Sequence, residues 1–270
     1  VIGGRAVLPT VCAVAWMINA CEQLYPGYDF FRVFDYKVYK GLVFDDTLAP
    51  VHRLTIQEVQ ADTKPAPEAA IRVLDARITS ETGGGLPRNH YGAQITLCRD
   101  RPEPGNSTAL EVTERDPIAG DRLYREGILF HGPSFQGVER VLHMDDEGLT
   151  ARCRLAPIHP EVQGQFPIQT FNPYLADVQL QSLLIWATET YGYGGLPLKI
   201  RDSIYYHNPS FGEETYASMT VRSHTEHRLL ADVAVFNAQG RLYSRVRGAE
   251  ITLSPRLNHL FAENRLGGVA

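Results

Sequence analysis

Residues 171–192 read FNPYLADVQLQSLLIWATETYG, and this stretch decides the fold of the chain. Residues 174–190 contain neither Pro nor Gly, and Asn-Pro at 172–173 and Gly192 bound them, which is typical of a helix with defined ends. Almost no polar face is left by the apolar side chains of this run, which are Leu175, Val178, Leu180, Leu183, Leu184, Ile185, Trp186 and Ala187. A helix that is apolar on nearly all sides is predicted to be buried.

Two polar residues, Asp177 and Gln181, lie one turn apart on one face of this helix. A buried carboxyl group needs a hydrogen-bonding partner or must be protonated, and Gln181 is spaced to fix the rotamer of Asp177. An acid that stays protonated near neutral pH can give its proton to a leaving hydroxyl group. The alternative is an Asp in the first turn that faces water and favours the helix dipole.

The composition excludes several classes of protein. Of 270 residues, 44% are hydrophobic and 21% are charged, which is ordinary for a globular protein, and the net charge of −5 without a basic cluster argues against nucleic acid. The longest apolar run is too short to span a bilayer. No metal-binding motif or phosphate loop occurs. The four cysteines, Cys12, Cys21, Cys98 and Cys153, show no metal or disulfide spacing, so we expect a reducing, cytoplasmic location.

A second helix is predicted over residues 10–24, after a glycine-containing loop that ends in Pro9. Residues 100–108, DRPEPGNST, have the composition of a linker. Runs rich in β-branched and aromatic residues predict strands at residues 31–39, 51–60, 70–79, 91–98, 138–144, 149–155, 198–207, 215–222, 229–236 and 241–253.

A faint internal repeat relates the two halves of the chain. A shift of 167 residues places Asp35 on Asp202 and lays the helix at 10–24 on the helix of Asp177. Each half is therefore predicted to be a long buried helix followed by antiparallel strands that wrap it, an α+β organisation. We expect a first half at residues 1–108, a second half at 109–256 and an outgoing linker at 257–270.

Three segments together resemble the dehydratase domains of polyketide synthases and polyunsaturated-fatty-acid-type synthases. Residues 123–136, LYREGILFHGPSFQ, are similar to the family's Y-x-x-G-x-x-[YF]-x-G-P-x-F-Q segment. Residues 177–181 match its D-x-x-x-Q, and residues 4–9 match the end of its H-x-x-x-G-x-x-x-x-P. This resemblance implies a double hot-dog fold and an excised part of a multidomain synthase.

One departure concerns the family's catalytic histidine, which with Gly4 as the motif glycine would stand immediately before Val1. The family's N-terminal segment, which completes the first hot dog, is also missing, so we expect that the chain was cropped inside the domain. A smaller departure is LPT at residues 8–10, where the family commonly has LPG.

The resemblance implies loss of water from a 3-hydroxyacyl thioester on acyl carrier protein. The upstream histidine would take the α-proton and Asp177 would protonate the β-hydroxyl, with Gln181 as its orienter. Tyr124 would donate to the substrate or pack. His131 is expected not to react. The remaining residues implied to shape the site, through backbone path, apolar wall or helix start, are Gly127, Phe130, Gly132, Pro133, Phe135, Gly4 and Pro9.

No metal and no cofactor is expected, because the phosphopantetheine arm belongs to the carrier. The expected partners are acyl carrier protein and neighbouring synthase domains, with a homodimer left open and neither nucleic acid nor a membrane involved. Docking of the carrier would need a basic patch, for which the candidates are Arg140, Lys199, Arg201 and Arg245. Three alternatives stay open: a product-template-type cyclase, a hot-dog thioesterase, and a catalytically inactive double hot-dog scaffold.

Overall fold

The computed structural model describes residues 2–59, 71–81, 86–105, 112–163 and 168–266, with side chains up to residue 261. Its two long helices are α1 (Thr10–Leu24) and α3 (Pro173–Tyr191), and both lie where the sequence predicts them. The side chain of Asn172 caps α3, since its Oδ1 accepts hydrogen bonds from the backbone N–H groups of Tyr174 and Leu175. Gly192 ends α3 in the left-handed conformation, with φ of 69°.

The predicted strands are all present, and the described residues form one continuous antiparallel sheet in the order β4-β5-β6-β2-β10-β13-β12-β11-β9-β8-β7. A separate short ribbon pairs β1 (Ala6–Val7) with β3 (Val43–Phe44). The strands of the sheet are β2 (Asp29–Val38), β4 (His52–Val59), β5 (Ile71–Glu81), β6 (Pro87–Cys98), β7 (Ile118–Ala119), β8 (Val138–Asp145), β9 (Gly148–Cys153), β10 (Gly194–Tyr205), β11 (Thr215–Thr225), β12 (Arg228–Asn237) and β13 (Leu242–Ser254).

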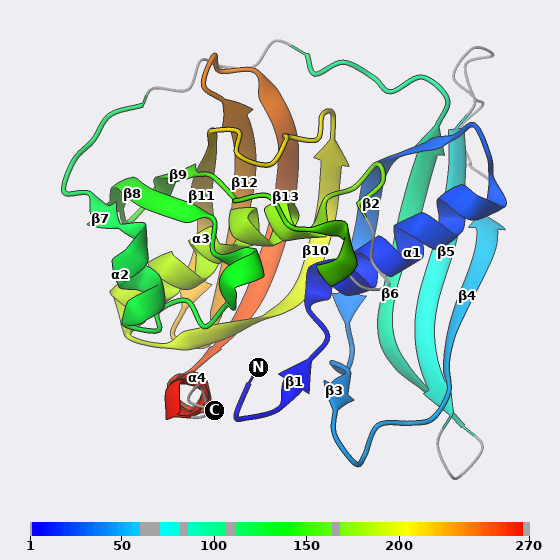
Figure 1. Ribbon diagram of the computed structural model, residues 1–270, viewed down its shortest axis with the longest axis horizontal. Coiled ribbons are helices and arrows are strands. Elements are labelled where there is room, and N and C mark those ends of the chain that lie inside the picture. Colours follow the sequence, from blue (N-terminus) through cyan, green and yellow to red (C-terminus); the bar gives the residue numbers. More distant parts are fainter. Residues whose placement is uncertain (1, 60–70, 82–85, 106–111, 164–167, 267–270) are drawn as a thin grey trace.

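Each half of the sheet wraps one long helix, which confirms the double hot-dog prediction (Figure 1). One buried cluster surrounds α1, and a second surrounds α3. The halves are joined edge to edge, because β2 pairs with β10. In that ladder Ile200 pairs with Tyr36 and Ser203 pairs with Val33. A shift of 167 residues interchanges these two pairs, so the faint repeat corresponds to a two-fold relation between the halves.

The short elements were not predicted from the sequence: the two-residue strands β1, β3 and β7, the helix α2 (Gly120–Arg125) and the 3₁₀ turns η1 (Pro133–Phe135) and η2 (Pro160–Val162). The expected boundary between residues 108 and 109 lies outside the described residues. Among the described helices, none combines the length and hydrophobicity needed to cross a bilayer.

The prediction of an outgoing linker from residue 257 is wrong for residues 257–266, which belong to the helix α4 (Pro255–Leu266). Ser254 and the proline at the first helical position start this helix, and the Ser254 hydroxyl accepts a hydrogen bond from the Arg256 N–H group. Phe261 is buried and stacks on the ring of Phe130 at 4.1 Å between ring centroids. This aromatic contact docks the helix on the domain, together with hydrogen bonds from Asn258 to the Gly192 carbonyl and from the Gly3 N–H group to the Leu260 carbonyl.

Candidate active site

A cavity of about 350 Å³ lies where the two halves meet. Its walls come from the start of α1, the loop before and through η1, the middle of α3, and the strands β10 and β13. Most of the lining is apolar, contributed by Leu8, Leu180, Leu183, Leu184, Ile200 and Ile251 among others. An apolar pocket with a few convergent polar groups is the usual form of a small-molecule site.

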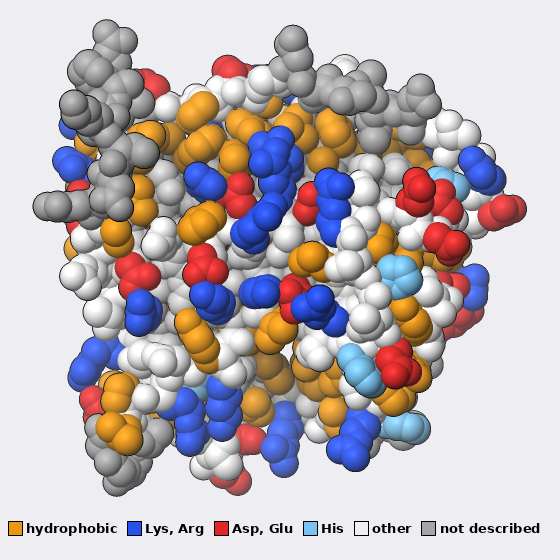
Figure 2. Space-filling model, turned by 180° about the vertical axis from the view of Figure 1, so that it is seen from behind, with side chains coloured by type: hydrophobic (Ala, Val, Ile, Leu, Met, Phe, Trp, Pro, Cys, Tyr) orange, Lys and Arg blue, Asp and Glu red, His pale blue; other side chains and the backbone are white. Residues whose placement is uncertain are grey.

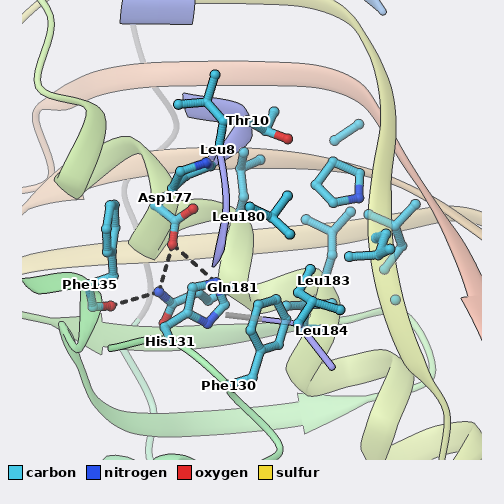
Figure 3. A pocket seen from close by; sticks show the side chains of 18 of the residues that line it. Leu8, Thr10, Phe130, His131, Phe135, Asp177, Leu180, Gln181, Leu183 and Leu184 are labelled. Atoms are coloured by element: carbon cyan, nitrogen blue, oxygen red, sulfur yellow. Dashed lines mark hydrogen bonds and ion pairs between the residues drawn. The ribbon is translucent and has the colours of Figure 1, made fainter. Parts of the chain in front are cut away.

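Asp177 is the carboxyl group at the centre of this cavity (Figure 3). Its Oδ2 atom accepts a hydrogen bond of 3.0 Å from Nε2 of Gln181, as the spacing of the two residues predicts. The same Gln181 nitrogen donates to the backbone carbonyl of Phe135 at 2.7 Å. The amide of Gln181 therefore ties α3 to the η1 turn and holds the Asp177 carboxyl group in one orientation.

His131 is the residue whose place the sequence did not reveal. Its Nε2 atom lies 3.2 Å from Oδ2 of Asp177, and the exposed fractions of the two side chains are 13% and 14%. The imidazole ring stacks on Phe130 with 4.5 Å between ring centroids. Burial lowers the pKa of His131 from its ordinary 6.5, and the nearby Asp177 opposes this shift only in part. The ring is therefore neutral at pH 7.

Tyr124 does not line the cavity but stands behind Gln181. Its hydroxyl donates a 2.8 Å hydrogen bond to Oε1 of Gln181 and accepts one of 3.0 Å from the backbone N–H of Val138. Burial raises the pKa of Tyr124 well above its usual 10, so the hydroxyl keeps its proton. Of the two roles expected for Tyr124, the structure shows packing, since Tyr124 lies against the core around α3, and its hydroxyl in addition fixes which way the Gln181 amide points.

The other residues expected at the site divide into two groups. Phe130, Gly132, Pro133, Phe135 and Pro9 line the cavity. Gly4 and Gly127 do not, and their φ angles of 72° and 70° explain the glycines instead, because other residues rarely adopt such angles. The LPT sequence at residues 8–10 forms a regular helix start, with Pro9 as the N-cap of α1. Thr10 also lines the cavity.

The thiol of Cys12, on α1, interacts electrostatically with the carboxyl group of Asp177. Burial first, and then the carboxyl group of Asp177, raise the pKa of Cys12 to about 12. Cys12 is thus a protonated thiol at pH 7 and not a nucleophile. In the described part of the chain, no group of three or more His, Cys, Asp or Glu side chains is placed to hold a metal ion.

A second polar pair, Lys199 and Glu250, also lines the cavity, with 3.0 Å between Nζ and Oε2. The charge of Lys199 is therefore paired with that of Glu250. Arg140 lies on a different strand, β8, and pairs with Glu114, so it does not join a patch with Lys199. On the face seen from behind, Lys and Arg side chains alternate with Asp and Glu (Figure 2). Two of the four candidate cations, Arg140 and Lys199, therefore lie in ion pairs with Glu114 and Glu250.

The family described as "Polyketide synthase dehydratase N-terminal domain" matches residues 102–260. Over 259 residues the chain is 29% identical to a polyunsaturated fatty acid synthase polypeptide of Thraustochytrium sp., covering 93% of this chain and 9% of that protein. Polyketide synthase GfsE of Streptomyces halstedii is 30% identical over 132 residues, 46% of this chain and 3% of the relative. The chain thus spans less than a tenth of the length of these two proteins.

Solved structures agree on the fold. A trans-AT polyketide synthase dehydratase domain from Brevibacillus brevis superposes with a TM-score of 0.71 at 15% identity, covering 94% of this chain and 88% of that one. The dehydratase domain of PpsC from Mycobacterium tuberculosis gives a TM-score of 0.66 at 17% identity, covering 94% and 87%. With the matching family segment holding both the FHGPSFQ loop and Asp177, this chain belongs to the polyketide synthase dehydratase family.

Proposed function

We propose that this domain removes water from a 3-hydroxyacyl thioester carried on acyl carrier protein and leaves the 2-enoyl thioester. The observation that carries the proposal is Asp177, a carboxyl group that accepts a hydrogen bond from Gln181 and lies 3.2 Å from the His131 imidazole in a mostly apolar cavity. A general base takes the α-proton, Asp177 gives a proton to the β-hydroxyl, the β-carbon–oxygen bond breaks, and water leaves as the double bond forms. The apolar wall excludes bulk water from this exchange.

The general base in this proposal is a histidine immediately before Val1, the position implied by the family motif. Ile2 lines the cavity. Consecutive Cα atoms are 3.8 Å apart, so the residue two positions before Ile2 has its Cα within about 8 Å of the Ile2 Cα. Such a residue is within reach of a substrate held beside Asp177. The start of α1, where Pro9 and Thr10 face the cavity, offers backbone N–H groups and a helix dipole to the thioester carbonyl.

Features of the cavity favour this function over the alternatives. Its volume of about 350 Å³ is near the lower end for small-molecule sites, which suits an acyl chain better than the long polyketide of a cyclase. The thiol of Cys12 is protonated, so a thioesterase would have to use another group as its nucleophile. A scaffold gains nothing from a buried carboxyl group, because burying polar groups costs free energy unless each is hydrogen-bonded.

The test uses the chain extended upstream to its natural boundary, with a short (3R)-hydroxyacyl carrier protein as substrate and intact mass as the readout. Asp177→Asn is run beside it. Loss of water that disappears in the variant supports both the reaction and the role of Asp177. With a histidine present upstream, no loss of water from short or medium-length substrates contradicts the dehydratase. An upstream sequence without histidine makes the scaffold the better explanation.

A further inference from the structure

The position of His131 beside Asp177 is not explained by packing alone. In Figure 3 dashed lines join the imidazole and the Gln181 amide to the same oxygen of Asp177. The imidazole comes from the loop before η1 and the amide from α3, and both side chains line the cavity. Gln181 donates a hydrogen bond to this oxygen and Nε2 of His131 lies 3.2 Å from it, and two N–H groups directed at one carboxyl oxygen stabilise negative charge there.

The ring of His131 has little freedom to turn. One face is covered by Phe130, with an interplanar angle of 22°, and Phe130 is in turn covered by Phe261 from α4. The backbone carbonyl of His131 accepts a 2.9 Å hydrogen bond from Nε2 of Gln136, which fixes the loop beneath the ring. The helix α4 therefore supports the placement of His131, although none of its described side chains lines the cavity.

The position of the imidazole proton follows from its neighbours. A neutral imidazole carries one N–H group, and Nε2 faces a carboxyl oxygen at 3.2 Å. The Nδ1 atom is buried and has no hydrogen-bond partner among the described residues. A hydrogen on Nδ1 would leave a buried donor unpaired and bring a lone pair of Nε2 against the oxygen. The hydrogen therefore belongs on Nε2.

We propose that His131 is a positioning residue for proton donation: its Nε2–H and that of Gln181 bind Oδ2 of Asp177, so that Oδ1 carries the proton given to the substrate. The inference rests on the proposed dehydration. As the O–H bond at Oδ1 breaks and the bond to the leaving hydroxyl forms, negative charge develops on Asp177. Two preorganised N–H groups at Oδ2 stabilise that charge in a cavity of low dielectric. His131 itself neither gains nor loses a proton.

Two substitutions separate this role from proton transfer. Gln at position 131 carries an amide nitrogen at the same number of bonds from Cβ as the histidine Nε2, so it can donate but cannot act as a base. Leu fills similar space without a donor. In the extended chain we expect His131→Leu to lower kcat about tenfold to a hundredfold with KM little changed, since one of two donors to a developing charge is lost. His131→Gln should restore most of kcat.

The matched control is His227→Leu, a histidine whose side chain is 77% exposed, and unfolding midpoints confirm that all variants fold. A His131→Gln variant as slow as His131→Leu would overturn the proposal in favour of proton transfer by the imidazole. A His131→Leu variant with the kcat of the parent would also overturn the proposal, because it would show that His131 does not contribute to the reaction.

A measurement without substrate separates this inference from the proposed function. Nitrogen-15 chemical shifts of the His131 ring should show that Nε2 carries the hydrogen and that Nδ1 is unprotonated. The shifts should change in the Asp177→Asn variant. A ring protonated on Nδ1 would overturn the proposal, whatever the activity. Should the parent domain fail to release water while the ring shifts are as expected, the dehydratase assignment fails and the hydrogen bond to Asp177 stands.

Discussion

The hydroxyl of Tyr124 donates to Oε1 of Gln181 at 2.8 Å, and this bond decides which end of the amide faces the cavity. With Oε1 occupied from behind, the nitrogen of Gln181 is the atom left to contact Asp177 and the carbonyl of Phe135. A tyrosine outside the cavity thus sets the polarity of a hydrogen bond inside it.

We therefore predict that Tyr124→Phe lowers kcat several-fold while leaving KM nearly unchanged. The substitution also leaves the backbone N–H of Val138 and Oε1 of Gln181 without partners, at a cost of about 1–3 kcal/mol in the free energy of unfolding. The matched control is Tyr91→Phe, which removes a buried hydroxyl that accepts from the Leu42 N–H group in the first half. Similar losses of kcat in both variants would show that Tyr124 acts through stability alone.

The contact between Gly137 and Val178 supports a second prediction. A Cβ atom at position 137 would lie 2.7 Å from Cγ2 of Val178 and 3.3 Å from Cβ of Leu155, so α3 would have to move beside Asp177. Gly137→Ala should lower the free energy of unfolding by about 1–3 kcal/mol, the usual cost of overpacking a core, and should lower kcat as well. Urea unfolding measures the first effect. Gly105→Ala, where a Cβ meets nothing within 4 Å, should change neither quantity.

At Gly132, unlike Gly137, we expect an alanine to leave stability unchanged. Residues other than glycine readily adopt its backbone conformation, and a Cβ atom there would meet nothing within 4 Å. Gly132→Ala should leave the unfolding midpoint unchanged. Since Gly132 lines the cavity, the added methyl group enters the space assigned to substrate, and kcat/KM should fall. An unchanged kcat/KM would show that the acyl thioester passes elsewhere in the cavity.

Local patterns predicted much of this structure and tertiary contacts account for the rest. Both long helices could be placed because Pro9 and Asn172 mark their starts and apolar side chains fill their faces. The bond from Gln181 to Asp177 followed from their spacing on one helix. His131 could not be placed in this way, because its loop reaches Asp177 only after η1 folds back onto α3.

The helix α4 was missed for a related reason. Its residues are mostly polar, and it is held by tertiary contacts, such as Phe261 on Phe130 and Asn258 on the Gly192 carbonyl, which no periodicity in its own sequence reveals. The joining of β2 to β10 likewise depends on the meeting of two edge strands from different halves. What remained hidden from the sequence is contact between segments distant along the chain.

The last prediction concerns pH and rests on His90. Its Nδ1 atom is 2.8 Å from the carbonyl oxygen of Lys40 and must carry the hydrogen, so its Nε2 accepts from the hydroxyl of Ser80, also at 2.8 Å. Burial lowers the pKa of His90 from its ordinary 6.5, as it does for His131. Protonation of Nε2 would also reverse the hydrogen bond from Ser80.

Because the pKa of His90 is lower in the folded than in the unfolded chain, its contribution to stability is complete above pH 6.5 and is lost as the pH falls through the folded value. We expect the free energy of unfolding to decrease from about pH 7.5 to about pH 5.5, above the range where exposed carboxylates titrate. His90→Gln and His131→Gln should each flatten that decrease, whereas the exposed His159→Gln should leave its slope unchanged. Urea unfolding at several pH values measures these slopes, and an equal slope in the parent and in His90→Gln would contradict the assignment to His90.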